Sequence, residues 1–364
     1  MIHVAIGTKA QFIKMAPIMV ALQEKGIEFN LIDLGQHSMI TRNLREELGL
    51  KSPDVTLSSG KNVARIGQGI RWLSGLLIKG LSRNWLKQHV FLNRPGVCLI
   101  HGDTVSTLIA LCLAKRAGLT VAHVEAGLRS FNILEPFPEE LVRLLAMRFA
   151  DILFAPSAWA RDNLATMGYG RKTVLISSNT SVETVFSSLS KAVDLGLGLK
   201  NYALVTVHRM ENIFSRQRLE FVLALIERIA RDIPVVFVQH PPTVNQMVKF
   251  GLQERLERLR NVTLSHILSH AEFVHLLDLC EFVVTDGGSI QEESYYLGKP
   301  CLLLRKKTER MEGIGRNVVL GECTLEAAER FIREYPHLSH AREGFAGIRP
   351  SKEIIDHLNS IGMA

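Results

Sequence analysis

Short apolar runs alternate along the whole chain with longer segments whose apolar positions recur at helical spacing. Uninterrupted apolar runs are typical of parallel strands that helices cover on both faces. Because runs and helical segments alternate in both halves, the pattern predicts repeated β-α-β units and two doubly wound parallel sheets. The expected strands cover residues 2–6, 28–34, 97–101, 120–126, 151–156, 173–177, 202–207, 234–239, 262–266, 281–286 and 300–304, and the clearest helices cover 104–117, 157–167, 216–231 and 288–297.

The chain has 364 residues, which is more than a single hydrophobic core usually organises, so two domains are expected. Periodicity fades and small residues increase near 185–200, which we interpret as the linker. The predicted N-terminal domain covers residues 1–185, and the second domain covers residues 195–349. After Pro350 the pattern becomes helical again, which predicts a terminal helix over residues 350–364.

Composition excludes several classes of protein. Apolar residues make up 47% and charged residues 22% of the chain, which is typical of a folded protein and not of a disordered one. The net charge of +7 suits an anionic ligand, but the lysines and arginines are scattered, which argues against a nucleic-acid groove. No apolar run reaches the length of a membrane span, so stable membrane insertion is not expected.

The cysteines bear on the compartment. The chain has five, widely spaced and mostly in apolar runs, which is typical of reduced and buried thiols. The apolar run at residues 2–6 is too short for the core of a signal peptide. These features together predict a cytoplasmic protein.

One basic segment stands apart from the β-α-β pattern. Its apolar residues from Ile66 to Trp85 recur every three or four positions, with basic residues between them. A basic amphipathic helix of this kind can lie on an anionic membrane. We favour the alternative, a helix that packs its apolar side on the core and exposes its basic side to solvent.

In open parallel sheets, ligands bind outside the carboxyl ends of the strands, so polar residues that directly follow a strand are candidate site residues. Both halves of the chain are rich in such residues. Those in the first half are Lys9, Lys14, His37, Asp103, Glu125, Glu139 and Arg143, and those in the second half are His208, Arg209, His240, Gly287, Gly288, Ser289 and Glu293.

Three of these residues are carboxylates at strand ends in the first half. Carboxylates in one site can have their pKa values pushed apart, so that one acts as an acid and another as a base. Asp103 is equally well explained as the cap of the helix at 104–117, and Glu139 as a favourable charge at a helix start. Glu125 is harder to explain structurally, because a charge at the end of a buried strand costs free energy unless it is paired or used.

The segment 287–289 in the second half has the pattern of an anion site. Its glycines allow close approach of the backbone to a phosphate, and free N–H groups at a helix start attract anions. Such a turn can also be purely structural. Glu293, one helical turn further on, is a candidate for holding ribose hydroxyls or else a solvent-exposed helix carboxylate. Lys9, His208 and Arg209 are cationic or potentially cationic side chains placed to meet a diphosphate.

Several enzyme classes lose their main support. The chain has thirteen histidines but no HxH pair, and its cysteines form no CxxC pair, so no dedicated metal site is expected. The chain also has no GxSxG elbow, no P-loop motif and no GxGxxG fingerprint at a strand end. Hydrolase, kinase and dehydrogenase hypotheses are therefore disfavoured.

Short motifs follow one another across most of the chain. They are IKMAP (13–17), GQH (35–37), HGDT (101–104), HVEAGLR (123–129), PEE with Arg143 (138–143), NT (179–180), HR with Glu211 (208–211), TDGGSIQEE (285–293), LGKP (297–300) and TER (308–310). In this order they resemble the non-hydrolysing bacterial UDP-N-acetylglucosamine 2-epimerase family. The resemblance implies the GT-B architecture, with two Rossmann-like domains whose parallel sheets face a central cleft and a C-terminal helix that crosses back to the first domain.

The resemblance also implies a reaction and residue roles. It assigns acid–base chemistry to Asp103, Glu125 and Glu139, with assistance from His208 and Arg143. The implied reaction eliminates UDP across C1–C2 of UDP-GlcNAc and adds it back with the opposite configuration at C2, for cell-surface polysaccharide biosynthesis. It needs neither a redox cofactor nor a metal, and the implied assembly is a homodimer. The implied nucleotide-binding residues are Gly287, Gly288, Ser289, Glu293 and Arg310.

Departures from the family pattern bear on the substrate. Lys9 stands where the family has an arginine, and a lysine cannot form the bidentate fork of a guanidinium. Gln11 replaces a carboxylate, the order Gly-Gly-Ser at 287–289 differs from the usual Ser-Gly-Gly, and Met39 replaces a polar residue in a loop linked to allosteric activation. A hydrolysing 2-epimerase, a GT-B glycosyltransferase and a non-catalytic sugar-nucleotide binder therefore stay open as alternatives.

Overall fold

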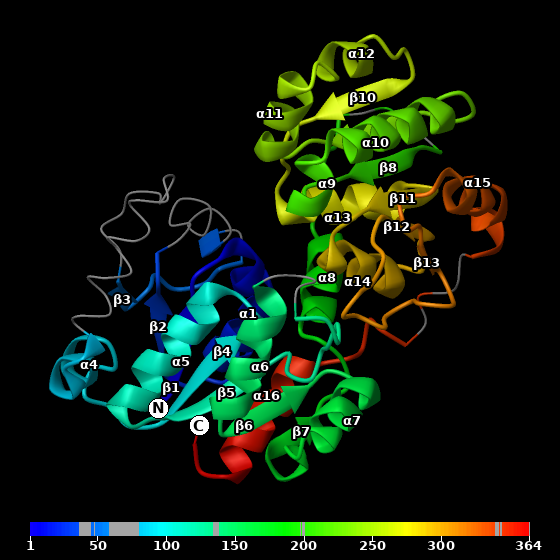
Figure 1. The fold of residues 1–364 in the computed structure, drawn as a ribbon. Coiled ribbons are helices and arrows are strands. Elements are labelled where there is room, and N and C mark those ends of the chain that lie inside the picture. The colour runs from blue at the N-terminus through cyan, green and yellow to red at the C-terminus, as the bar shows by residue number, and fades with distance from the viewer. Residues whose placement is uncertain are drawn as a thin grey trace. The chain divides into compact units, whose positions relative to one another are not determined.

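The computed structural model describes residues 1–35, 45–46, 48–57, 80–133, 138–196, 198, 201–338, 342 and 344–363. The chain forms two compact units. Unit 1 comprises Met1–Thr184 and Ile348–Ala364, and unit 2 comprises Val185–Gly347. The chain passes from unit 1 to unit 2 within helix α8 (Ser181–Leu189) and returns just before helix α16 (Pro350–Ser360), as Figure 1 shows.

Unit 1 is built on a seven-stranded sheet with the order β3-β2-β1-β4-β5-β6-β7, in which every neighbouring pair is parallel. Its strands are β1 (Ile2–Ile6), β2 (Phe29–Asp33), β3 (Val55–Thr56), β4 (Val97–His101), β5 (Thr120–Val124), β6 (Ile152–Ala155) and β7 (Thr173–Leu175). The sheet is accompanied by α1 (Lys9–Glu24), α4 (Arg83–His89), α5 (Val105–Ala117), α6 (Glu139–Phe149), α7 (Ala158–Thr166) and α16.

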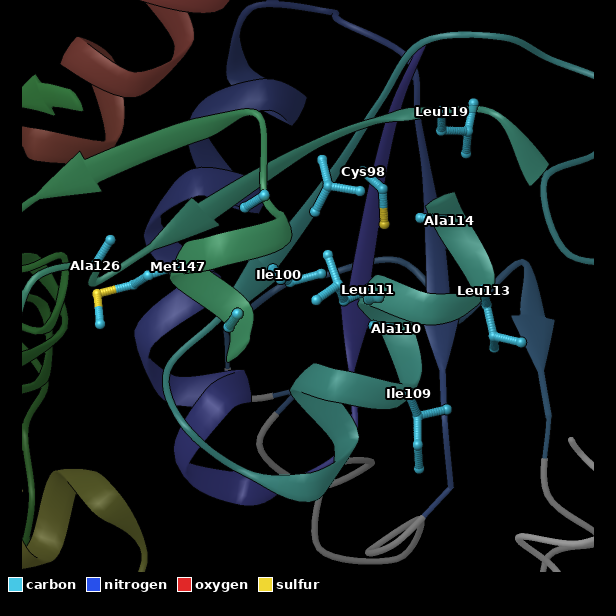
Figure 2. Close-up of a cluster of buried hydrophobic side chains, with 14 of the residues drawn as sticks. Cys98, Ile100, Ile109, Ala110, Leu111, Leu113, Ala114, Leu119, Ala126 and Met147 are labelled. Atoms are coloured by element: carbon cyan, nitrogen blue, oxygen red, sulfur yellow. The ribbon is translucent and has the colours of Figure 1, made fainter. Parts of the chain in front are cut away.

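Successive side chains of the unit 1 strands enter two hydrophobic layers, one on each face of the sheet. Ile2, Val4 and Ile6 of β1 belong to the layer that contains α1 and α16, two helices that pack against each other (Figure 1). Figure 2 shows the other layer, where Cys98 and Ile100 of β4 lie among side chains of α5 and α6. Because both faces are covered, the strands need apolar residues at every position, as their sequences predict.

Unit 2 repeats the architecture with a six-stranded parallel sheet in the order β10-β9-β8-β11-β12-β13. Its strands are β8 (Ala203–Thr206), β9 (Val235–Val238), β10 (Val262–Ser265), β11 (Phe282–Thr285), β12 (Cys301–Leu303) and β13 (Val318–Leu320). Its helices include α9 (Met210–Ile213), α10 (Arg216–Ile229), α11 (Pro241–Lys249), α12 (Gln253–Glu257), α13 (His270–Leu279), α14 (Gly288–Tyr296) and α15 (Leu325–Glu334).

The strand order reverses once in each sheet. In unit 1 the chain lays down β2 and β3 on one side of β1 and then starts β4 on the other side. In unit 2 it lays down β9 and β10 on one side of β8 and then starts β11 on the other. Ligands of open parallel sheets bind outside the strand ends at such reversals, called topological switch points. The residues that follow β1, β4, β8 and β11 are therefore the ones to inspect.

The fold-class prediction of two doubly wound parallel sheets is confirmed. The sequence pattern missed the two edge strands β3 and β13, because runs of two and three residues carry no periodicity. Helix α8 continues through Leu189, so the segment interpreted as a linker from residue 185 begins inside a helix. The basic segment lies outside the described residues up to position 79, whereas Trp85 on α4 packs against the core.

The five cysteines are free thiols. Burial raises the pKa of Cys98, Cys280 and Cys301 to about 12. The prediction of buried thiols is wrong for Cys112, which is exposed, and Cys323 is half-buried. Among the described residues, no helix combines the length and apolar character that crossing a membrane requires.

Two histidines inside the unit 1 sheet make its stability depend on pH. His3 and His123 are fully buried, and burial lowers the pKa of each from 6.5 to about 4. Below pH 6.5 the two histidines are protonated in the unfolded chain but stay neutral in the folded protein until about pH 4. The free energy of unfolding should therefore fall as the pH is lowered from 6.5 to 4, by about 3 kcal/mol for each histidine. Denaturant melts of the wild type and of His123→Gln, which loses this titration, measure the difference in slope. Replacement of the exposed His266 by Gln should leave the slope unchanged.

Candidate functional site

Gln11 ties the two strand ends at the unit 1 switch point. Its Oε1 accepts hydrogen bonds from the Gly7 and Thr8 amides after β1, at 2.9 and 3.2 Å. Its Nε2 donates to the His101 carbonyl at the end of β4 and to the Thr104 hydroxyl, both at 2.9 Å. The approach is so close that a Cβ at Gly7 would lie 2.3 Å from the Cβ of Ser106 on α5. The amide of Gln11 therefore holds this edge of the site in place.

Glu125 follows β5 and is the most constrained carboxylate of unit 1. Its side chain is buried, and its backbone has φ +68°, a left-handed conformation that non-glycine residues rarely adopt. The Lys14 ammonium lies 2.5 Å from Oε2, and the Asn179 side-chain amide donates to the same oxygen. His101 Nε2 lies 3.6 Å away. Strained backbone held by surrounding contacts is found mainly at functional sites.

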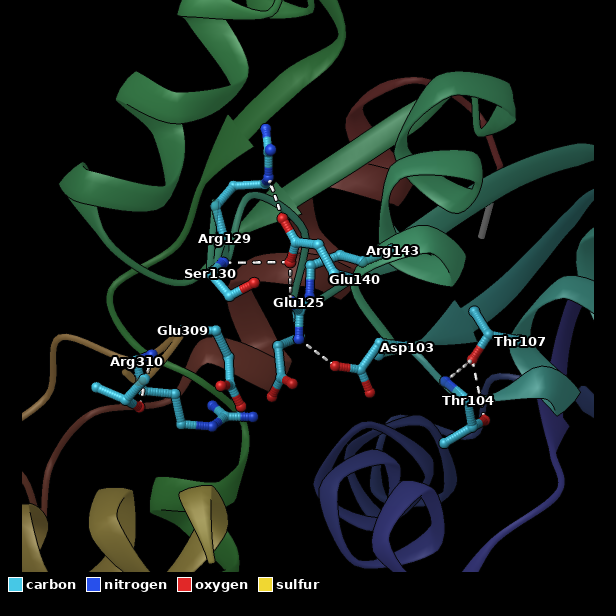
Figure 3. A network of polar contacts seen from close by, with 12 residues as sticks. Asp103, Thr104, Thr107, Glu125, Arg129, Ser130, Glu140, Arg143, Glu309 and Arg310 are labelled. Atoms are coloured by element: carbon cyan, nitrogen blue, oxygen red, sulfur yellow. Dashed lines mark hydrogen bonds and ion pairs between the residues drawn. The ribbon is translucent and has the colours of Figure 1, made fainter. Parts of the chain in front are cut away.

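Asp103 belongs to a chain of buried ion pairs, which Figure 3 shows. Arg143 of α6 bonds to Asp103 through Nη2 and to Glu140 Oε2 through Nη1, the latter at 2.5 Å. Glu140 also accepts from Arg129 Nε at 2.5 Å and from the Ser130 amide at 3.2 Å. Thr104, not Asp103, caps α5, so the helix-cap interpretation of Asp103 is wrong.

Burial and pairing act in opposite directions on Glu140. Burial raises the pKa of this carboxyl, but hydrogen bonds from Arg129 and the Ser130 amide, together with the Arg143 charge, outweigh burial and place its pKa below the usual value. Glu140 thus stays ionised and fixes the Arg143 guanidinium. The other end of that guanidinium holds Asp103 at the strand end.

Glu139 is the third candidate carboxylate and begins helix α6. Its Oε2 is buried and has no hydrogen-bond partner among the described residues. A buried carboxylate oxygen without a partner is costly, and such atoms in folded proteins call for an explanation, of which a bound ligand is one.

Asp286 joins the two strand ends at the unit 2 switch point. It follows β11 and is fully buried, and it accepts hydrogen bonds from the backbone amides of His208 and Arg209 after β8, at 3.0 and 2.9 Å. The Asn212 side chain donates to it at 2.9 Å. Asp286 thereby plays in unit 2 the part that Gln11 plays in unit 1.

The predicted anion turn lies beside the same strand ends. Gly287 caps α14, and a Cβ on it would lie 3.0 Å from Cε1 of His208. The His208 ring stacks on that of His240, with centroids 4.7 Å apart, and its Nδ1 lies 3.3 Å from Asp286. A Cβ on Gly288 would meet Glu309 and Arg310 at 3.2 and 3.3 Å. The start of α14 is therefore lined by a histidine, a carboxylate and a guanidinium.

Consecutive carboxylates of α14 take different partners. Glu292 is fully buried and bonds to Tyr296 and to Arg310, at 2.9 and 3.1 Å. Glu293 Oε1 lies 3.2 Å from His270 Nε2. Glu293 is 6% exposed, so the alternative that it is a solvent-exposed helix carboxylate is wrong.

Within unit 1 the structure brings together Lys14 and Glu125, and separately Arg143 and Asp103, while Lys9 is the first residue of α1. Within unit 2 it brings His208 and His240 to the glycine turn, and Arg209 Nη2 lies 4.0 Å from Glu309. Ser289 is the second residue of α14. His37 lies outside the described residues.

Sequence reasoning missed several residues that support the candidates. Asn179 and Asp286 belong to motifs that were recognised, but a motif does not say which atom a side chain bonds. Glu140 was detectable, because Arg143 lies three residues further along the same helix and faces it. His270 had no local signal, since its partners Ser188 and Glu293 are distant in sequence.

Two parallel sheets with charged groups at both switch points define the class of α/β enzymes that bind nucleotide ligands at strand ends. The chain belongs to the UDP-N-acetylglucosamine 2-epimerase family, whose model matches residues 20–358. The predicted resemblance is confirmed.

Individual relatives agree with this assignment. A UDP-N-acetylglucosamine 2-epimerase from Methanococcus maripaludis is 30% identical over 356 residues, which cover 92% of this chain and 93% of that protein. A UDP-2,3-diacetamido-2,3-dideoxy-D-glucuronate 2-epimerase from Pseudomonas aeruginosa is 30% identical over 328 residues, 87% of each protein. The crystal structure of Methanocaldococcus jannaschii UDP-GlcNAc 2-epimerase with UDP-GlcNAc and UDP matches with a TM-score of 0.82 at 28% identity and covers 99% of both chains.

Replacement of Gln11 by Glu should destabilise the protein by about 2 kcal/mol, because a carboxylate cannot donate to the His101 carbonyl. Gln23→Glu on the same helix is the matched control. In the described part of the chain the Gln23 amide donates to the exposed Gly49 carbonyl, so the loss should be within about 0.5 kcal/mol. Urea melts of both variants measure the two losses. Equal losses would show that Gln11 is not the tie described above.

Glu140→Gln should cost about 3 kcal/mol of folding free energy, because it leaves two guanidinium groups facing a neutral amide at a fully buried position. The control is Glu329→Gln, whose ion pair with Arg228 is partly exposed and should contribute no more than about 1 kcal/mol. Thermal and urea melts of the two variants give the comparison. A cost for Glu140→Gln as small as that of the control would contradict the ion-pair chain.

Proposed function

We propose that the protein interconverts the C2 epimers of a UDP-N-acetylhexosamine, of the UDP-GlcNAc and UDP-ManNAc type, by the non-hydrolysing route. The observation that carries the proposal is Glu125. A buried carboxylate in a left-handed backbone, held by a lysine and an asparagine at a strand end, serves no evident structural purpose. Membership of the 2-epimerase family supplies the reaction in which such a group is used.

The reaction conserves electrons and atoms. A base removes the proton from C2, and the C2–H electron pair becomes the C1=C2 double bond. The bond from C1 to the diphosphate oxygen breaks, and its electron pair leaves with UDP. In the reverse sense, UDP adds to C1 while C2 receives a proton on the opposite face, which inverts the configuration. Since no electrons enter or leave, the reaction itself requires no redox partner.

Unit 1 supplies the acid–base groups of the proposal. Glu125, held by the Lys14 ammonium and the Asn179 amide, is the group to which the proposal assigns removal of the C2 proton. Arg143 orients Asp103. Glu139, whose buried Oε2 has no partner among the described residues, provides a further proton-transfer group. Together these three carboxylates allow removal of a proton from one face of the sugar and delivery to the other.

Unit 2 supplies the groups that hold UDP. The N–H groups at the start of α14 and the side chains of His208, Arg209 and Arg310 suit a leaving diphosphate, whose negative charge grows as the C1–O bond breaks. The proposal assigns to Glu293, one turn into the same helix, the acceptance of hydrogen bonds from ribose hydroxyls.

The identity of the sugar rests on this proposal alone. The Pseudomonas aeruginosa relative acts, by its name, on a diacetamido uronate, so membership of the family admits more than one hexose. We propose UDP-GlcNAc as the first substrate to test. The product of the reaction is proposed to serve cell-surface polysaccharide biosynthesis. The proposed working form of the protein is a cytoplasmic homodimer. Sedimentation of the purified protein tests the dimer.

Incubation with UDP-GlcNAc in D2O, followed by NMR, tests the reaction. We expect deuterium at C2 and a UDP-ManNAc-type product. Glu125→Gln should lower the exchange rate by at least about a hundredfold, because it removes the base, while leaving UDP affinity within a few fold. The control is Glu24→Gln, which replaces an exposed carboxylate at the C-terminal end of α1. This variant should exchange at the wild-type rate.

Other outcomes identify the alternatives. Release of free sugar together with UDP would indicate a hydrolysing epimerase. Binding of UDP-GlcNAc without any exchange would indicate a glycosyltransferase that lacks its acceptor or a non-catalytic binder. Exchange at the wild-type rate in Glu125→Gln would remove that residue from the mechanism.

A further inference from the structure

Ser188, His270 and Glu293 form a continuous hydrogen-bonded chain inside unit 2. Ser188 Oγ lies 3.0 Å from His270 Nδ1, and His270 Nε2 lies 3.2 Å from Glu293 Oε1. The three residues are 3%, 8% and 6% exposed, so solvent competes little for these bonds. The elements that they join, α8, α13 and α14, are separate in sequence.

The hydrogen-bond partners define which ring nitrogen carries the proton. A carboxylate oxygen accepts hydrogen bonds, so the contact with Glu293 needs the proton on His270 Nε2. In that tautomer Nδ1 accepts from the Ser188 hydroxyl. The chain has Ser188 at one end and Glu293 at the other, with the His270 ring between them. It is arranged to hold one oxygen of Glu293.

The other oxygen of Glu293 points to the purpose of this restraint. Among the residues that the structure describes, Glu293 Oε2 has no hydrogen-bond partner. The preceding carboxylate differs, because Glu292 bonds through both oxygens to Tyr296 and Arg310. A carboxylate that is fixed at one oxygen and open at the other is pre-organised to accept from a ligand hydroxyl.

We propose that His270 is a positioning residue that fixes Glu293 for the ribose of the nucleotide and thereby sets the preference for ribonucleotides over 2′-deoxyribonucleotides. The inference rests on the proposed function, in which Glu293 meets ribose hydroxyls. Without the Nε2–H donor, Glu293 is free to change rotamer, and its ordering upon binding of UDP costs free energy. A nucleotide that lacks the 2′-hydroxyl gains less binding free energy from the fixed carboxylate. It therefore also loses less binding free energy when His270 no longer fixes Glu293.

The chain also connects the ribose position to the crossing between the units. Ser188 lies near the end of α8, the helix in which the chain passes from unit 1 to unit 2. His270 is the first residue of α13, directly after its cap Ser269. The orientation of Glu293 therefore depends on α8 through one histidine ring.

Two isosteric variants separate positioning from packing. Asparagine places its amide near the position of Nδ1 and does not reach Glu293, whereas glutamine places its amide nitrogen near the position of Nε2 and keeps the donor. We expect His270→Asn to lower the ratio of UDP affinity to dUDP affinity about fivefold, the worth of one hydrogen bond of about 1 kcal/mol. His270→Gln should keep the ratio within about twofold of the wild type. Calorimetric titration of each protein with UDP and dUDP measures the ratios.

His275→Asn is the matched control. His275 lies on the same helix and bonds through Nε2 to the Lys191 carbonyl, 2.9 Å away, which belongs to no candidate site residue. Its replacement should leave the ratio unchanged. Ser188→Ala removes only a hydroxyl and should lower the ratio by a smaller factor than His270→Asn, so it decides the matter if a histidine variant fails to fold.

The outcomes distinguish failure of this inference from failure of the proposed function. Glu293→Gln should reduce the UDP to dUDP ratio at least as much as His270→Asn. Suppose that Glu293→Gln lowers the ratio of UDP affinity to dUDP affinity. If the two His270 variants then both keep the wild-type ratio, or both lower it by the same factor, the positioning role of His270 is wrong while the nucleotide site stands. If Glu293→Gln leaves the ratio unchanged, the ribose assignment and this inference both fall. If the wild type binds neither nucleotide, the proposed function itself fails.

Discussion

The structure depends on one constraint, the need to tie neighbouring strand ends together where the chain leaves them in opposite directions. At a switch point two parallel strands end side by side, and the turns that follow them separate, so backbone N–H and C=O groups lose their ladder partners. In unit 1 Gln11 bonds both to amides after β1 and to the carbonyl of the last residue of β4. In unit 2 Asp286 accepts amides from the turn after β8. Both residues are buried, so they act as internal parts of the sheet edge.

The charges near these edges are arranged by the same logic. Arg143 is almost fully buried and bonds to two carboxylates, of which Glu140 is buried and Asp103 is partly exposed. A buried ion pair adds little net stability, but removal of one member leaves an uncompensated charge, so the pairs define geometry more than they add free energy. Lys14 and Glu125 form a second pair of this kind. Two of the candidate carboxylates, Glu125 and Asp103, are thus each held by a basic side chain.

The residues that support the candidates are themselves buried. Glu140 bonds to Arg143, Asp286 accepts from the Arg209 amide, and Ser188 bonds to His270. Sites held by supporting hydrogen bonds lose less entropy when a ligand binds. The left-handed backbone at Glu125 is the cost of such an arrangement, since it places a carboxylate where a glycine would be more stable.

The sequence by itself determined the two parallel sheets, the core helices and the segments at strand ends that hold the candidate site residues, because hydrophobic periodicity and local motifs are properties of neighbouring residues. Only the tertiary structure decided the partners of each side chain. The sequence left open whether Asp103 caps a helix and whether Glu293 is exposed. The structure makes Asp103 an ion-pair partner of Arg143 and bonds Glu293 to His270. These contacts join residues far apart along the chain, so no local pattern encodes them. The sequence pattern also missed the short edge strand β3. Two residues are too few to show a periodicity, and β3 is recognised as a strand only because it pairs with β2.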